Sequence, residues 1–193
     1  MNVIDKYFIY PAKPTYIPPT STLFGKLDND LNYVAEVKKN GWRCLVRKID
    51  GKITLWTRHK TTINDALPTL RKELTILKIP DDSILDGELL EHRSVAKDSL
   101  MLWGIYRWAG NWYDKVSYYH TRDTLSLLLQ PQISTIIFQP KSTLLNKRDF
   151  YERILKEDVD NEGIVLKKLD APVPFFWNSS KEITTWLKVK ERS

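Results

Sequence analysis

Cysteine is almost absent from this chain of 193 residues, and Cys44 is its only example. A single cysteine cannot form a disulfide within the chain, which excludes a disulfide-stapled secreted domain and favours a reducing compartment. The sequence also has no apolar run long enough to span a membrane, and its first residues do not have the apolar core of a signal peptide. We therefore expect a soluble, cytoplasmic protein with no membrane partner, and we expect it to be a monomer.

A large excess of one charge is missing as well. The chain has 30 Lys and Arg residues against 24 Asp and Glu residues, a net charge of +6. This moderate excess suits a polyanionic partner such as a nucleotide or a nucleic acid. Hydrophobic residues make up 42% of the sequence, and aromatic residues are abundant, with seven Trp, nine Tyr and six Phe. A chain of this length and composition can bury the core of one folded domain.

The spacing of apolar residues predicts an α+β fold with largely antiparallel sheets flanked by helices. Tight hairpin turns are expected at Asn40-Gly41 and Asp50-Gly51. Strands are predicted over residues 33–37, 42–49, 52–58, 83–92, 99–108, 135–140, 163–169 and 184–190. Helical spacing is found over 66–79, where Leu67, Leu70, Leu74 and Leu77 share a face, over 121–130 with Thr121 as the N-cap, and over 146–158. The proline-rich residues 10–22 predict an extended segment.

Four charged clusters fall on the predicted strands. They are Lys38 with Arg43, Glu88, Glu162 with Lys167, and Lys188 with Lys190. Residues two apart on a strand share a face, so Lys188 and Lys190 point to the same side. Taken singly, each cluster is also what the solvent-exposed side of an antiparallel sheet looks like.

Taken together and in order, four motifs point to chemistry. KKNGWR (38–43), LDGEL (85–89), NEGIVLK (161–167) and WLKVK (186–190) resemble the ordered motifs of the covalent nucleotidyltransferases. This superfamily comprises ATP-dependent DNA ligases, RNA ligases and mRNA capping enzymes. The resemblance covers nearly the whole chain and implies an ATP-grasp-like nucleotidyltransferase (adenylation) domain over residues 23–193, preceded by the extended proline-rich arm of residues 1–22.

The resemblance implies that Lys38 attacks the α-phosphate of ATP and forms a lysyl-nucleotide. A lysine amine is nucleophilic only when deprotonated, and neighbouring cations and desolvation lower its ordinary pKa of about 10.4. Lys188, Lys190 and Arg43 would supply that field and neutralise the phosphate. Glu88 and Glu162 would face the ribose and a metal ion. Mg²⁺, or Mn²⁺ in its place, prefers such oxygen ligands together with phosphate oxygens.

Further positions match the nucleotide-binding residues of the superfamily. Glu36 corresponds to a glutamate that reads the adenine amino group, and a carboxylate there favours ATP over GTP because it would repel guanine O6. Arg58 corresponds to an arginine that contacts phosphate or ribose, and Lys167 ends the NEGIVLK motif. Trp103 is expected to stack on the base, with Tyr106 as the second candidate. A surface ion pair remains the alternative reading of Glu36 and Arg58, and a core position that of Trp103.

The sequence also departs from the superfamily pattern. Asn40 replaces the commoner Asp, and Gly104 stands where an acidic residue usually follows the stacking aromatic. The resemblance stops at Lys190, close to Ser193, so we expect no C-terminal OB-fold domain. The resemblance without such a domain implies a minimal nucleotidyltransferase core, and we expect a phage or viral source.

Three functions compete at this point. The first is an ATP-dependent polynucleotide ligase that seals nicked or broken DNA or RNA through a lysyl-AMP intermediate. The second is a GTP-dependent, capping-type guanylyltransferase. The third is a ligase-like nucleic-acid-binding protein that needs a partner protein to supply the nucleic-acid clamp. For the first, exposed cations would hold the nucleic acid, and the candidates are Lys60, Arg93, Lys97 and Lys147.

Overall fold

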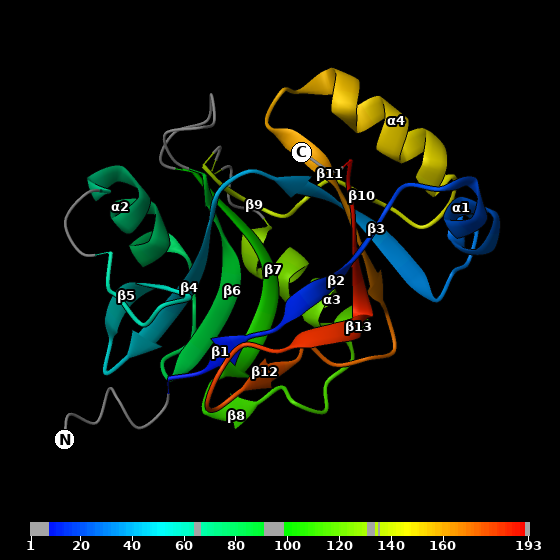
Figure 1. Ribbon diagram of the computed structural model, residues 1–193. Helices are drawn as coiled ribbons and strands as arrows, with labels where there is room; N and C mark the ends of the chain where they lie inside the picture. The colour runs from blue at the N-terminus through cyan, green and yellow to red at the C-terminus, as the bar shows by residue number, and fades with distance from the viewer. Residues whose placement is uncertain (1–7, 64–66, 91–98, 131–133, 135, 192–193) are drawn as a thin grey trace.

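Two β-sheets face each other in the computed structural model, which describes residues 8–63, 67–90, 99–130, 134 and 136–191 (Figure 1). The first sheet has the order β10-β3-β11-β13-β2. Its strands are β2 (Lys13–Ile17), β3 (Tyr33–Lys39), β10 (Ser142–Thr143), β11 (Asn161–Lys168) and β13 (Glu182–Val189). All its pairings are antiparallel except that of β13 with β2. This sheet carries Lys38 of the first charged motif and the two motifs that contain Glu162 and Lys188, whereas Arg43 and Glu88 belong to the second sheet.

The second sheet has the order β5-β4-β6-β7-β8, with β9 beside β7. Its strands are β4 (Trp42–Ile49), β5 (Lys52–Thr57), β6 (Ser83–Leu90), β7 (Ser99–Trp108), β8 (Asn111–Trp112) and β9 (Ile137–Phe138). A short pair, β1 (Tyr10–Pro11) with β12 (Phe175–Phe176), lies beside the two sheets. The predicted α+β fold with mainly antiparallel pairing is therefore confirmed.

Helices cover the outer faces of both sheets. Helices α1 (Ser21–Leu27) and α4 (Lys147–Glu157) pack on the first sheet, beside β3 and β11 (Figure 1). Helices α2 (Pro68–Ile76) and α3 (Tyr118–Leu129) pack on the second sheet. The predicted leucine face of residues 67–77 is confirmed, because all four of its leucines are buried in that cluster. A third apolar cluster, with Val34, Leu45, Ile84 and Trp186 among its members, joins the inner faces of the two sheets.

The two predicted hairpin turns have different outcomes. Asp50 and Gly51 both have positive φ and join β4 to β5 as a hairpin, as predicted. The prediction at Asn40-Gly41 is wrong, because β3 and β4 belong to different sheets. Neither of these two residues has a positive φ, which a two-residue type I′ turn requires. The chain instead crosses between the sheets there, and a Cβ on Gly41 would come within 2.6 Å of Glu88 Cγ and of the Leu89 carbonyl oxygen.

The start of α3 also differs from the expectation. The structure begins this helix at Tyr118, and the side chain of Ser117 accepts a hydrogen bond from the backbone N–H of His120. The prediction of Thr121 as N-cap is wrong, because Thr121 lies inside the helix and is fully buried. Burial of the Tyr118 ring between the sheets extends the helix upstream of the apolar spacing that marked it in the sequence.

The proline-rich segment is extended only as far as the start of α1. Within the described residues, β1 and β2 occupy the predicted arm, and helix α1 begins at Ser21, inside it. Strand β2 runs parallel to β13 and forms one edge of the first sheet. No helix in the described part of the chain is long and apolar enough to cross a membrane.

Candidate active site

A cavity of about 640 Å³ opens between the two sheets, and most of the predicted site residues line it. They come from six strands and from the turn after β5, and they are Glu36, Lys38, Arg43, Arg58, Glu88, Trp103, Lys167 and Lys188. The two remaining candidates, Glu162 and Lys190, do not line the cavity but lie beside it. Glu162 contacts the Lys38 amine, and Lys190 Nζ is 4.0 Å from Glu162 Oε2. The structure thus brings all ten predicted residues into one region.

Lys38 lies at the crossing between the sheets, near the end of β3. Its Nζ forms an ion pair with Glu162, and both side chains are about one quarter exposed. Lys38 and Lys190 help to lower the pKa of Lys188, although burial is the larger cause. A cluster of positive charge therefore surrounds Lys38. Its neighbour Lys39 instead forms an ion pair with Asp158 at 2.6 Å.

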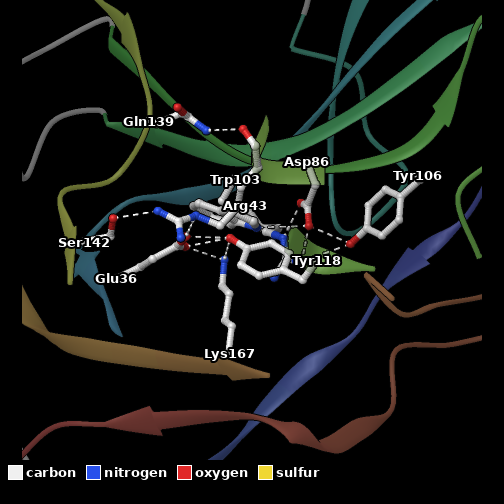
Figure 2. Close-up of polar contacts among 10 residues, drawn as sticks. Glu36, Arg43, Asp86, Trp103, Tyr106, Tyr118, Gln139, Ser142 and Lys167 are labelled. Carbon is white, nitrogen blue, oxygen red and sulfur yellow. Dashed lines mark hydrogen bonds and ion pairs between the residues drawn. The ribbon is translucent and has the colours of Figure 1, made fainter. Parts of the chain in front are cut away.

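Arg43 is held by a buried carboxylate that the sequence reading did not assign. Asp86 is fully buried and accepts 2.5 Å hydrogen bonds from Nε and Nη2 of Arg43, the bidentate geometry in which Arg–carboxylate pairs are strongest. Asp86 also accepts from the hydroxyl of Tyr106 at 2.6 Å and from the indole N–H of Trp103 at 3.1 Å (Figure 2). Tyr106, the second candidate for base stacking, is fully buried behind this carboxylate and does not line the cavity.

A second buried network surrounds Glu36, which is only 3% exposed. The hydroxyl of Tyr118 lies 2.7 and 2.8 Å from its two oxygens, and Lys167 Nζ lies 2.8 Å from Oε2. Arg122 Nε lies 3.3 Å from Oε1. Lys167 Nζ also donates to the Tyr118 hydroxyl at 2.9 Å (Figure 2).

Three aromatic rings enclose the Lys167 ammonium. Its Nζ lies 4.4 Å from the ring centre of Trp186, 4.7 Å from that of Tyr118 and 5.1 Å from that of Trp103. Burial lowers the pKa of Lys167 to about 8, with Glu36 opposing the shift. The indole N–H of Trp186, another cavity residue, is buried without a hydrogen-bond partner among the described residues.

Glu88 on β6 is the cross-strand partner of Arg43 on β4. Burial raises its pKa to about 7, although Arg43 and Lys38 oppose the shift, and the nearby Glu162 contributes to it. The described residues contain no group of three or more His, Cys, Asp or Glu side chains that could hold a metal. Two carboxylates fit Mg²⁺ only if phosphate oxygens complete its shell, which is the usual arrangement for Mg²⁺ bound with a nucleotide.

Two glycines allow the close approaches that this site needs. Gly163 follows Glu162 with φ +145°, and a Cβ there would lie 2.1 Å from the Val189 carbonyl oxygen. Gly104 is paired with Asp86 across β6 and β7, and its Cβ would lie 3.0 Å from that of Asp86. The glycine at 104 therefore leaves room for the buried carboxylate that holds Arg43 and Trp103.

The mouth of the cavity is formed in part by the turn after β5. Arg58 Nε donates to His59 Nε2 at 3.0 Å, and both residues line the cavity. Lys60, in the same turn, is exposed. Lys147 was expected to be an exposed cation, and this is wrong: it is fully buried, and its ammonium donates to the carbonyl oxygens of Asp28, Asp30 and Leu144. Arg93 and Lys97 lie outside the described residues.

Sequence reasoning missed Asp86, Tyr118, Arg122 and His59 as members of this region. Asp86 was visible inside LDGEL, and its only signal was its position two residues before Glu88, on the same face of the predicted strand. Tyr118 and Arg122 belong to none of the four motifs. Because 82 residues separate Tyr118 from Glu36, no local sequence pattern indicates their contact.

Comparison with known proteins matches this fold to DNA ligases. No family model matches the sequence. A segment of 62 residues is 42% identical to the SPbeta prophage-derived DNA ligase-like protein LigB of Bacillus subtilis (strain 168), and covers 32% of this chain and 22% of that protein.

Two solved structures extend the likeness to nearly the whole chain. A mycobacterial DNA ligase D, complexed with ATP and MES, matches with a TM-score of 0.70 at 17% identity, over 98% of this chain and 62% of its own. A Lig E DNA ligase, described as binding DNA with a minimal scaffold, matches with a TM-score of 0.65 at 15% identity, over 96% of this chain and 70% of its own. The chain therefore has the fold of the nucleotidyltransferase domain of DNA ligases, and the resemblance read from its motifs is confirmed at the level of the fold.

Proposed function

We propose that the protein is an ATP-dependent polynucleotide ligase that acts through a lysyl-AMP intermediate, with DNA as its acceptor. The observation that carries the proposal is the position of Lys38. Its amine lies beside the cavity, in contact with Glu162 and within a cluster of positive charge that includes Lys188. Such a field stabilises the charge that develops on an attacked phosphate.

Two groups of cavity residues suit the two parts of ATP. Glu36, Lys167 and Trp103 suit a purine through a carboxylate, an ammonium and an aromatic ring. Lys38, Arg43, Arg58 and Lys188 are cations that suit the phosphates. The ATP in the mycobacterial DNA ligase D structure supports the same choice of nucleotide.

The reaction proceeds in three displacements, two at the α-phosphorus of ATP and the third at the 5′-phosphorus of the nucleic acid. Lys38 Nζ attacks the α-phosphorus of ATP, the bond to the pyrophosphate oxygen breaks, and the amine loses a proton as the P–N bond forms. The nucleic-acid 5′-phosphate then displaces Lys38 from AMP. Finally the 3′-hydroxyl attacks that 5′-phosphate, loses its proton and expels AMP, which leaves a phosphodiester.

Each residue around Lys38 has a separate task in these transfers. Glu162 orients the Lys38 amine, and Arg43 and Lys188 neutralise the phosphate oxygens. Glu88 and Glu162 would hold Mg²⁺ or Mn²⁺, which supplies further charge stabilisation at the phosphates when bound. Glu36 and Lys167 bind the base.

Covalent labelling tests the proposal directly. The purified protein is incubated with Mg²⁺ and either ATP or GTP carrying ³²P at the α-position, and the products are separated on a denaturing gel. A label from ATP supports the ligase, and its transfer to nicked DNA, followed by sealing, completes the case. A label from GTP alone would establish the capping-type alternative, and no label from either nucleotide would leave a nucleic-acid-binding protein.

A further inference from the structure

Tyr118 and Arg122 form a layer behind the base-binding end of the cavity. Both belong to the N-terminal part of α3, one turn apart, and their separation of four residues puts them on one face of the helix. Neither lines the cavity, whereas Glu36 and Lys167, which they contact, both do. Tyr118 is fully buried, and Figure 2 shows its hydroxyl between the ends of the Glu36 and Lys167 side chains.

Hydrogen-bond capacity defines what this layer leaves open to a ligand. A carboxylate has about four acceptor positions. Tyr118, Lys167 and Arg122 approach Glu36 and take up three of them. An ammonium has three N–H donors, and Lys167 directs one to Glu36 and one to Tyr118. The cavity therefore receives one acceptor from Glu36 and one donor from Lys167, side by side.

The order of that acceptor and donor distinguishes adenine from guanine. The edge of adenine presents the amino group as a donor next to N1 as an acceptor. Guanine presents the reverse, with O6 as an acceptor next to the N1–H donor. If Glu36 and Lys167 are held in fixed positions, their acceptor and donor match the edge of adenine or that of guanine, but not both. If the two groups could exchange places, they would match both bases.

The Tyr118 hydroxyl is suited to fixing this order because it bridges both groups. It donates to the Glu36 carboxylate and accepts from Lys167. The helix turn that carries Tyr118 is hydrogen-bonded to the segment just after β11. The backbone N–H of Tyr118 donates to the carbonyl oxygen of Ala171 at 2.7 Å, and that of Tyr119 donates to the carbonyl oxygen of Leu169 at 3.0 Å. These bonds hold the start of α3 next to the end of β11, behind Glu36 and Lys167 as seen from the cavity.

Arg122 fixes the other oxygen of Glu36 from one turn further along. Its Nε lies 3.3 Å from Oε1, and its Nη2 donates to the Oγ of Ser142 on β10 at 2.7 Å. Ser142 is the direct partner of Glu36 in the β10–β3 pairing. The guanidinium therefore braces the carboxylate against the neighbouring strand.

We propose that Tyr118 and Arg122 are positioning residues that set nucleobase specificity, by holding the Glu36 acceptor and the Lys167 donor in the order that matches adenine. This inference rests on the proposed use of ATP. It assigns the specificity of the site to a helix face that touches neither the nucleotide nor the nucleophile.

The test measures binding rather than turnover, so that it is independent of ligation. In a Lys38→Ala background, which cannot be labelled, equilibrium dialysis gives the Kd of ATP and of GTP for three further variants. Tyr118→Phe removes the bridging hydroxyl, and Arg122→Gln removes the brace at a side chain that is about one quarter exposed. Tyr119→Phe is the control, because Tyr119 is the adjacent tyrosine of the same turn and is 54% exposed.

We expect Tyr118→Phe to raise the Kd for ATP about tenfold or more, the usual cost of losing hydrogen bonds to charged groups, without raising that for GTP. Arg122→Gln should lower the preference for ATP in the same direction, and Tyr119→Phe should leave it unchanged. In the Lys38 protein, the labelling rate of the Tyr118→Phe variant at saturating ATP should change less than about threefold, because the variant loses ground-state binding only.

Two results would overturn the inference. One is an unchanged ratio of the two Kd values in Tyr118→Phe and Arg122→Gln; the other is an equal loss of both nucleotides, which indicates a collapsed cavity. Thermal unfolding of each variant identifies collapse independently, and Arg122→Gln decides the matter if Tyr118→Phe does not fold. Failure of the wild-type protein to form a covalent adduct would refute the ligase proposal, while the dialysis result would still decide this one.

Discussion

The indole N–H of Trp103 donates a 3.1 Å hydrogen bond to the fully buried carboxylate of Asp86. The ring of Trp103 meanwhile lines the cavity, with the Arg43 guanidinium 5.2 Å from its centre. One side chain thus offers a surface to the ligand and is locked from behind by the carboxylate that also holds Arg43. This arrangement separates stacking from positioning, and the two can be measured apart.

Replacing Trp103 tests that separation. Trp103→Ala should weaken ATP binding by roughly 1–3 kcal/mol, the range for losing a base–aromatic stack. Trp103→Phe keeps a ring but loses the bond to Asp86, so it should retain most of the affinity and show a slower labelling rate through a looser Arg43. The Kd of ATP and the single-turnover labelling rate separate the two effects. A silent Trp103→Ala variant would remove this residue from the base-binding site.

Loss of the Lys38 amine should abolish covalent labelling and leave the fold intact, because the Lys38 side chain is partly exposed at the crossing between the sheets. Lys39→Ala is the matched control. It removes a partly exposed ion pair with Asp158, an interaction usually worth less than about 1 kcal/mol, so labelling should persist. The measurement is the acid-labile, base-stable adduct formed from labelled ATP, and its survival in Lys38→Ala would assign the nucleophile to another residue.

Restoring the acidic residue expected at position 104 should destabilise this protein. An Asp side chain there would meet the Asp86 side chain across β6 and β7, and it would add an unpaired carboxylate in a buried position. The loss of unfolding free energy should be about 3 kcal/mol or more for Gly104→Asp and smaller for Gly104→Ala, which adds only the steric contact. Urea denaturation measures both, and equal stability of Gly104→Asp and the wild type would contradict the packing described here.

ATP affinity should fall as the pH rises through about 8, because the pKa of Lys167 is lowered to about 8. The ammonium is charged below that value and donates to the base, whereas the neutral amine above it leaves Glu36 without its ion-pair partner. Glu36, Tyr118, Asp86 and Arg43 are the ionisable groups around it, and burial raises the pKa of Tyr118 well above its usual value. Dialysis in the Lys38→Ala background between pH 6.5 and pH 9 follows this titration, with Glu88→Gln in the same background as the control for the Glu88 carboxyl, whose pKa is about 7. A flat profile would count against the prediction.

Lys147 should matter for stability and not for nucleotide binding. Lys147→Met leaves three carbonyl oxygens without their shared donor, which should lower the unfolding free energy by roughly 3 kcal/mol. Lys156→Met, on the same helix and exposed, should be nearly neutral. Urea denaturation compares the two, and similar midpoints would show that the carbonyl cradle contributes little.

Local patterns predicted the parts of this fold that depend on neighbouring residues. The leucine face of α2 and the Asp50-Gly51 hairpin follow from periodicity and from two residues that adopt positive φ. Asn40-Gly41 has the same local chemistry and a different outcome, since the pairing of β3 with β11 and of β4 with β6 separates its two strands. The local propensity of Asn-Gly for a turn does not show which strands its two neighbours pair with.

The candidate site divides in the same way. Ordered motifs located Lys38, Glu88 and Glu162 correctly in one region, because the motifs carry the superfamily pattern. Tyr118 and Asp86 were not predicted, because their hydrogen-bond partners are distant in sequence and come close only in the folded protein. Lys147 was wrongly predicted to be exposed, because the sequence does not show that three backbone carbonyl oxygens accept hydrogen bonds from its ammonium.

The pairing of β3 with β11 and of β11 with β13 has a consequence for how the protein is made. Lys38 and Glu162, 124 residues apart, come together only through these pairings. A ribosome therefore releases Lys38 long before the strand that carries Glu162, and the sheet cannot close until β13 has emerged. Contacts of such long sequence separation slow folding. Apart from β9, the second sheet is built from consecutive strands between Trp42 and Trp112. We therefore expect it to form first, and the first sheet to pack against it afterwards.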